Sequence, residues 1–273
     1  MSTATDNLKR DFCKCVERAA RHRRQSEVFA DMVRAMSLSV EGATLTRAET
    51  LADIEREYAE IRARYTADEF AEFPKALALT VAALEAARED FLGHALEALG
   101  ASNTRNGQFL TPVCVSRMMA ACLYPSLDNY TPGQIVKLND PACGTSGFLV
   151  AAAEFLQEIG AKADGSRIFG YDIDRTMLRI GAMNMMTHGV DNPYIEYRDS
   201  LSDQNPDKEK YSLILANPPF KGSLDYDTVS ADLLKVCKTK KTELLFLALM
   251  LRMLRVGGRC AVIVPDGVLF GSS

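Results

Sequence analysis

Residues 213–220 read LILANPPF, and this stretch decides how the chain is organised. Three apolar residues lead into Ala216, and two consecutive prolines follow Asn217. Proline has no backbone N–H to give to a sheet, so a buried strand must end here. We therefore expect a strand over residues 213–216 that stops in a rigid corner.

The corner places hydrogen-bond acceptors beside an aromatic ring. Pro218 and Pro219 present carbonyl oxygens without amide hydrogens, Asn217 adds a side-chain amide oxygen, and Phe220 adds an aromatic face. These groups suit a planar base with an exocyclic amine, because the oxygens can accept both amine hydrogens while the base stacks on Phe220. A plain loop between a strand and a helix would explain the same sequence, so the rest of the chain must decide between a loop and a binding site.

Composition indicates an ordinary globular protein, with 273 residues of which 47% are apolar and 25% are charged. The start of the chain has no signal-peptide pattern, and the longest apolar run, residues 244–251, is too short to cross a bilayer. Seven cysteines at irregular spacings indicate reduced thiols, and Cys13, Cys15 and His22 lack a fourth metal ligand. We expect a cytoplasmic protein with no membrane contact and no metal.

The charge balance limits how the chain could bind nucleic acid. Its formal net charge is −4, and neither the first 100 residues nor the remainder has more basic than acidic residues. A protein that grips DNA alone normally needs a surface that neutralises phosphates. If nucleic acid is the substrate, we expect a partner to supply many of the contacts that bind it.

Two regions are expected, a helical N-terminal region over residues 1–100 and an α/β domain over residues 101–273. The first is rich in Ala, Glu, Arg and Leu without strand-like alternation, and residues 46–49 and 66–69 match the capping box. At the start of the second, Pro112 is expected to open a helix with Thr111 as its N-cap.

Strands and helices alternate through the α/β domain. Strands are expected over residues 135–139, 168–173, 194–198, 213–216 and 260–265, with helices over 148–159, 175–189 and 242–254. Such a βαβ series predicts a doubly wound, mostly parallel, Rossmann-like sheet with its ligand at the carboxyl ends of the strands.

Each of the first four strands ends in a polar signal. Gly144 and Gly147 follow the first strand and let the backbone approach a ligand, and Asp172 lies 25 residues after Gly147, where an acid can meet ribose hydroxyls. The third strand ends at Asp199 and the fourth at the NPPF corner. Two glycines alone are a weak signal, but four such strand ends together predict a site for a nucleoside with a charged tail.

Six segments in order carry a resemblance to a known family. They are GQFLTP (107–112), DPACGTSGF (140–148), YDID (171–174), RDSL (198–201), NPPF (217–220) and GGRCAVIVPDGVLFGSS (257–273). This series resembles the N6-adenine DNA methyltransferases, and most closely the modification subunit of type I restriction-modification systems. The resemblance covers residues from about 101 to 273.

The resemblance implies S-adenosylmethionine as cofactor and gives each position a role. Phe109 and Thr111 would contact the cofactor. Its methionine part would be surrounded by Asp140, Ala142, Gly144 and Gly147. Asp172 would bind the ribose hydroxyls, Ile173 would lie against the adenine ring of the cofactor, and Asp199 would face its amine.

The target adenine, flipped out of DNA, would be received by Asn217, Pro218, Pro219 and Phe220, and Asn217 would also border the cofactor. Hydrogen bonds from the adenine N6 amine to the Asn217 side chain and the Pro218 carbonyl would favour a pyramidal nitrogen and direct its lone pair at the methyl group. Catalysis would then rest on positioning and preorganised acceptors.

The chain also departs from that family. Only five strands can be placed where the family has seven, so the sheet is expected to be incomplete after the fifth strand, and no target-recognition region is found. A fragment of a longer product, a partner that completes the sheet, or a protein that binds the cofactor without methylating DNA would each explain this. DNA and a specificity subunit or another protein are the expected partners.

Two further readings stay open at this point. One is a methyltransferase that acts on RNA or on a protein amide, since NPP-type corners also serve those substrates. The other is a catalytically silent module that binds S-adenosylmethionine or a partner protein.

Overall fold

The apolar run ahead of Asn217 forms strand β4 (Tyr211–Ala216), in which all six residues are buried. It belongs to a five-stranded sheet with β1 (Leu138–Asp140), β2 (Ile168–Asp172), β3 (Tyr194–Tyr197) and β5 (Leu254–Val262). The strand order is β3-β2-β1-β4-β5, and every neighbouring pair is parallel. The expected doubly wound sheet is confirmed, and its strand order reverses between β1 and β4, where such sheets bind ligands.

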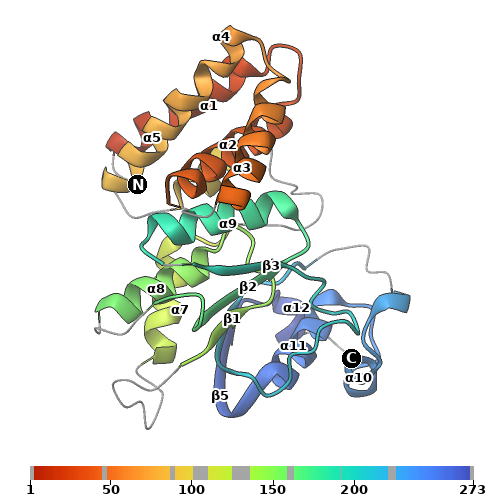
Figure 1. The fold of residues 1–273 in the computed structure, drawn as a ribbon. Helices are drawn as coiled ribbons and strands as arrows, with labels where there is room; N and C mark the ends of the chain where they lie inside the picture. The colour runs from red at the N-terminus through yellow and green to blue at the C-terminus, as the bar shows by residue number, and fades with distance from the viewer. Residues whose placement is uncertain are drawn as a thin grey trace. The chain divides into compact units, whose positions relative to one another are not determined.

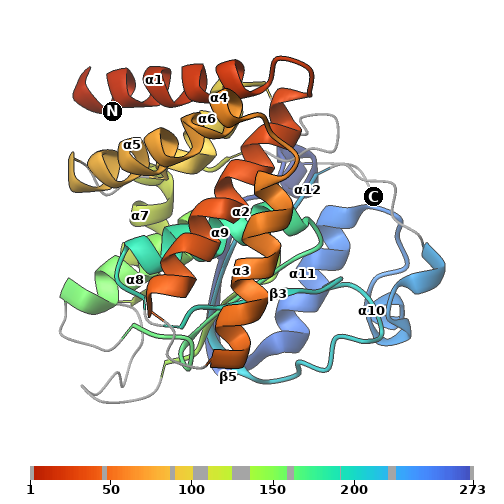
Figure 2. The same cartoon turned by 45° about the horizontal axis from the view of Figure 1, so that its top comes forward.

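Helices cover both faces of this sheet. The helices α7 (Val113–Leu123), α8 (Gly147–Glu158) and α9 (Arg175–Thr187) pack on one face, and α10 (Ala231–Val236) and α11 (Thr242–Met253) pack on the other. Figures 1 and 2 both show α7 and α8 on one side of the strands and α10 and α11 on the other. Two short elements complete this part, η3 (Tyr226–Thr228) and α12 (Asp266–Phe270).

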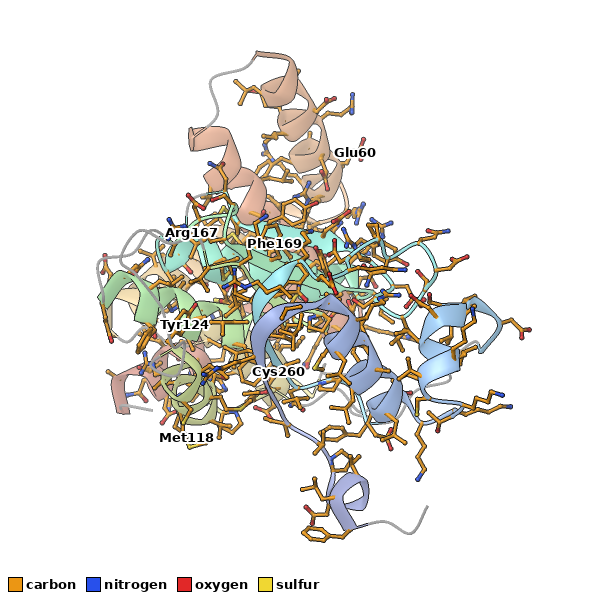
Figure 3. All side chains as sticks on the ribbon, turned by 90° about the horizontal axis from the view of Figure 1, so that it is seen from below. Glu60, Met118, Tyr124, Arg167, Phe169 and Cys260 are labelled. Atoms are coloured by element: carbon orange, nitrogen blue, oxygen red, sulfur yellow. The ribbon has the colours of Figure 1, made fainter. Side chains whose placement is uncertain are left out.

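Helix α7 is held firmly on α8. The ring of Tyr124, at the end of α7, stacks on Phe155 with the ring centres 4.7 Å apart, and Arg117 pairs with Glu154 at 3.0 Å. Met118 lies on the outer side of α7 and is 58% exposed (Figure 3). Helix α7 therefore packs along α8 from Arg117 to its C-terminal end.

The computed structural model describes residues 3–44, 48–86, 90–100, 110–124, 136–158, 163–190, 192–220 and 226–270. These residues form two compact units, Met1–Ser102 and Asn103–Ser273. No helix in the described ranges has the length and apolar character needed to cross a membrane.

The first unit consists of helices throughout its described residues. They are α1 (Thr3–Ala19), α2 (Gln25–Thr44), α3 (Ala48–Arg62), α4 (Ala67–Phe70), α5 (Glu72–Ala86) and α6 (Phe91–Ala98). The capping box expected at residues 66–69 is confirmed, because the Thr66 side chain accepts from the Glu69 amide and the Glu69 carboxylate accepts from the Thr66 amide. The capping box expected at residues 46–49 lies partly outside the described residues.

Several local expectations are wrong. Strand β1 begins at Leu138 where residue 135 was expected, and it includes Asp140, because the parallel ladder with β2 runs from Leu138 to Asp140. Strand β5 begins at Leu254, directly after α11, because Leu254 already pairs with Tyr211 before the strand bulges around Gly257. Pro112 is the N-cap of α7, and Thr111 does not cap it.

Candidate active site

The loop after β1 is held by hydrogen bonds that its backbone amides donate. Asp140 is only 1% exposed, and its Oδ1 accepts from the Ala142 amide at 3.0 Å. Burial raises the pKa of the Asp140 carboxyl to about 8. The Cys143 amide donates to the Tyr171 carbonyl at 2.9 Å, which ties the loop to β2. Asp140 and Ala142 therefore shape the loop from within.

Gly144 is the position in this loop where only glycine fits easily. Its φ is +52°, in the left-handed region, and a Cβ built there would meet no atom within 4 Å. The backbone at Gly144 thus borders open space that a ligand can approach. Gly147 differs, because a Cβ there would come no closer than 4.0 Å to Ser116 Oγ, which is an ordinary contact.

The loop after β1 (residues 141–146) is called the glycine loop below. Asp172, the last residue of β2, contacts it. Its Oδ2 accepts from the Gly144 amide at 2.9 Å, and its Oδ1 accepts from the Asp174 amide at 2.8 Å. Burial raises the pKa of this carboxyl, although the two amides act in the opposite direction. A carboxylate has about four lone-pair sites, so Asp172 keeps capacity for ligand hydroxyls. The neighbouring Ile173 is 62% exposed and open to stacking.

The end of β3 joins the same loop through a residue that sequence reasoning missed. Ser200 is buried, and its hydroxyl donates to the Pro141 carbonyl at 2.7 Å. Asp199 beside it is exposed, and its Oδ1 accepts from the Leu201 amide at 3.1 Å. Ser200 thereby fixes the segment that carries Asp199 against the loop after β1.

Asn184 is a second residue that was missed. It is buried on α9, and its side-chain nitrogen donates to the Thr145 carbonyl of the glycine loop at 2.8 Å. A polar residue among the methionines of an apolar helix face is the signal that could have found it.

At the end of β4, Asn217 and Thr111 meet although they are 106 residues apart. Asn217 Nδ2 donates to Thr111 Oγ1 at 3.1 Å. The buried Asn217 Oδ1 has no hydrogen-bond partner among the described residues. Pro218 is buried, and Pro219 and Phe220 are partly buried. Phe109 lies outside the described residues.

These groups come from the carboxyl ends of four parallel strands and from the start of α7. Asp140 and Asp172 are the last residues of β1 and β2, Asn217 directly follows β4, and Asp199 comes two residues after the end of β3. Among the residues that the structure describes, no group of three or more His, Cys, Asp and Glu side chains could hold a metal ion. The donors and acceptors suit an organic ligand with hydroxyls and amines.

A family model described as N-6 DNA Methylase matches residues 87–273, which is more than half of the chain. The chain belongs to the N-6 DNA methylase family. The match includes the glycine loop and the NPPF corner of this family member.

Individual relatives agree with the family. The methylase subunit of the type I restriction enzyme EcoEI from Escherichia coli is 31% identical over 173 residues, 60% of this chain and 34% of that protein. The type II methyltransferase M.VspI from a Vibrio species is 32% identical over 168 residues, 59% of this chain and 38% of that protein. The N-6 DNA methylase chain spans about a third of the length of these curated relatives.

A solved structure supports the same fold. The modification subunit of a type I restriction enzyme from Vibrio vulnificus YJ016 is 29% identical and superposes with a TM-score of 0.52, covering 80% of this chain and 44% of that one. The N-6 DNA methylase fold is therefore common to the two proteins.

Proposed function

We propose that this chain contains the catalytic centre of an S-adenosylmethionine-dependent DNA methyltransferase that modifies N6 of adenine. The observation that carries the proposal is the buried, unpartnered Asn217 Oδ1 in a rigid proline corner at the end of β4. Family membership favours DNA adenine over RNA bases or protein amides as the substrate.

The glycine loop and β2 fit the expected cofactor. Gly144 leaves open space beside its backbone, and Asp172 is an acceptor for ribose hydroxyls held in place by two amides. Ile173 offers an exposed apolar side chain for the adenine ring, and Asp199 lies at the next strand end for its amine. S-adenosylmethionine, when bound, supplies an electrophilic methyl group on a positively charged sulfur.

The NPPF corner performs the remaining chemistry by positioning. The N6 lone pair of adenine is delocalised into the ring and is a poor nucleophile. Asn217 Oδ1 and the Pro218 carbonyl would accept the two amine hydrogens, which favours a pyramidal nitrogen and stabilises the positive charge that develops on it. Phe220 would stack on the base and hold it flipped, and Pro219 keeps the corner rigid.

A partner is part of the proposal. The net charge of −4 is unsuited to gripping DNA unaided. The EcoEI relative is a methylase subunit of a type I restriction enzyme. We infer that this chain acts as the modification component of a restriction-modification system, with a specificity subunit or an equivalent protein supplying target recognition.

Labelled methyl transfer tests the proposed activity. Unmethylated DNA is incubated with the purified chain and labelled S-adenosylmethionine, alone and with a lysate of the host, and the digested product is analysed for N6-methyladenine. Asn217→Ala should lower transfer by about 100-fold or more while leaving cofactor affinity nearly unchanged. Asp172→Ala should instead raise the cofactor Kd by about 10-fold or more, because charge-assisted hydrogen bonds are lost.

Asn7→Ala on the exposed surface of α1 is the matched control and should keep full activity. Label only with lysate would indicate that a partner is required. Label on RNA or protein would move the assignment to those substrates. Cofactor binding without any label would leave a silent binding module as the function.

A further inference from the structure

The Asn217 side chain must present one particular end to the substrate. An amide carries an oxygen that accepts and a nitrogen that donates two hydrogens. If the amide turned by 180°, its NH2 group would face the amine of the base, and the acceptor needed at N6 would be lost. The proposed chemistry therefore depends on a group that fixes which end of the Asn217 amide, oxygen or nitrogen, faces the base.

Thr111 is the group that contacts the nitrogen end. Asn217 Nδ2 donates to Thr111 Oγ1 at 3.1 Å, and Asn217 Oδ1 is left buried and without a partner among the described residues. Leaving a buried acceptor unsatisfied destabilises the folded protein, because the oxygen has lost its hydrogen bonds to water. Such a cost is expected where an incoming hydrogen-bond donor completes the site.

The backbone around Thr111 is suited to hold this hydroxyl still. Thr111 precedes a proline, which disfavours the helical region for its backbone, and Pro112 has φ −55° and caps α7. The Pro112 carbonyl accepts from the Val115 and Ser116 amides at 2.9 and 3.2 Å. Helix α7 in turn packs on α8 and the sheet. Thr111 is therefore joined through Pro112 to a packed helix, which limits how far its hydroxyl can follow a rotating amide.

We propose that Thr111 is a positioning residue, which orients the Asn217 amide so that Oδ1 faces the N6 amine of the target adenine. This inference rests on the proposed function for its catalytic consequence. It differs from the role that the family resemblance gave to Thr111, which was contact with S-adenosylmethionine. Kinetics can distinguish the two roles. Loss of a positioning residue lowers kcat, whereas loss of a cofactor ligand raises the Kd for S-adenosylmethionine.

The kinetic test compares two substitutions of nearly the same size. Thr111→Val removes the hydroxyl and keeps the branched shape, whereas Thr111→Ser keeps the hydroxyl. Methyl transfer is measured with the full chain, together with whichever partner the wild type needs. We expect Thr111→Val to lower kcat by roughly 10- to 100-fold with the cofactor Kd within about threefold of wild type, and Thr111→Ser to restore most of kcat. A raised Kd with unchanged kcat would overturn the proposal and make Thr111 a cofactor ligand.

A second readout does not require activity. In 15N NMR spectra of the full chain, the Asn217 side-chain NH2 signals are assigned by their absence in Asn217→Ala. One Asn217 amide proton should exchange slowly with water in the wild type and in Thr111→Ser, and rapidly in Thr111→Val. Exchange that is equally fast in the wild type and in Thr111→Val would overturn the inferred contact even if the enzyme is active. A slow proton in an inactive wild type would support the contact and reject the proposed function.

Discussion

Asp140 shows what burial does to a single carboxyl group in this fold. The side chain is 1% exposed, and burial raises its pKa from 3.8 to about 8, although the Ala142 amide favours the charged form. Near neutral pH the folded protein therefore holds a proton on Asp140 that the unfolded chain has released.

That difference gives stability a dependence on pH with a definite sign. Because the folded pKa is the higher one, the contribution of Asp140 is fully present below pH 3.8, is lost as pH rises toward about 8, and is constant above that. Between pH 6 and 8 the free energy of unfolding of the wild type should fall relative to Asp140→Asn by about 1 kcal/mol per pH unit. Urea denaturation at a series of pH values measures this. Parallel profiles for the two proteins would mean that Asp140 is already ionised at neutral pH.

At the scale of elements, a buried charged network fixes the segment between β3 and β4. Asp207 accepts from Tyr171, Tyr211 and Lys210 at 2.6–2.8 Å and from Arg198 at 3.0 Å. Burial alone would raise the pKa of Asp207, but the donors from Lys210, Tyr211 and Tyr171 hold it below its ordinary value. The Arg198 guanidinium also lies 3.8 Å from the centre of the Tyr171 ring. The network anchors the backbone on either side of Asp199.

Breaking this network should destabilise the sheet unit. Asp207→Asn removes the charge of the buried carboxylate that Lys210, Arg198 and two tyrosine hydroxyls share, although Arg198 keeps its ion pair with Glu196, so we expect a loss of about 3 kcal/mol in the free energy of unfolding. Asp203→Asn, at an exposed position of the same segment, is the matched control and should change stability by less than about 0.5 kcal/mol. Chemical denaturation compares the two variants. Equal stability of both would show that the network is energetically neutral.

At the scale of the whole molecule, each of the two units has a core of its own. In the first unit Phe12 is fully buried and packs edge-to-face on Phe29 and Phe91, with ring centres 5.9 and 5.6 Å apart. In the second, Leu213 is fully buried in the core on one face of the sheet. Separate cores indicate that each unit can lose stability by itself.

Hydrogen exchange measured by mass spectrometry tests this separation. Phe12→Ala should destabilise its unit by about 3–5 kcal/mol and speed exchange in residues 3–100, with little change in residues 136–216. The reciprocal variant Leu213→Ala should speed exchange in the sheet and leave the helical unit unchanged. A similar acceleration throughout the chain in either variant would show that the units unfold together.

Much of the fold could be predicted because the signals involved act over a few residues. Alternating strands and helices require a parallel sheet, and the prolines after Asn217 end β4 where they do. The places of Asp172 and Asn217 at strand ends could be predicted for the same reason. Element boundaries were less certain, since pairing with a neighbouring strand extended β1 to Asp140 and began β5 at Leu254.

By itself the sequence determined that the second unit has a parallel sheet and which residue types follow each strand along the chain. Both depend on local effects, namely the spacing of apolar residues and the backbone preferences of glycine and proline. Only the tertiary structure decided which of these groups bind one another. The contacts between Thr111 and Asn217 and between Ser200 and Pro141 join residues 106 and 59 positions apart. Hydrogen-bond partners at such separations are chosen by the packing of helices on the sheet, which no local pattern encodes.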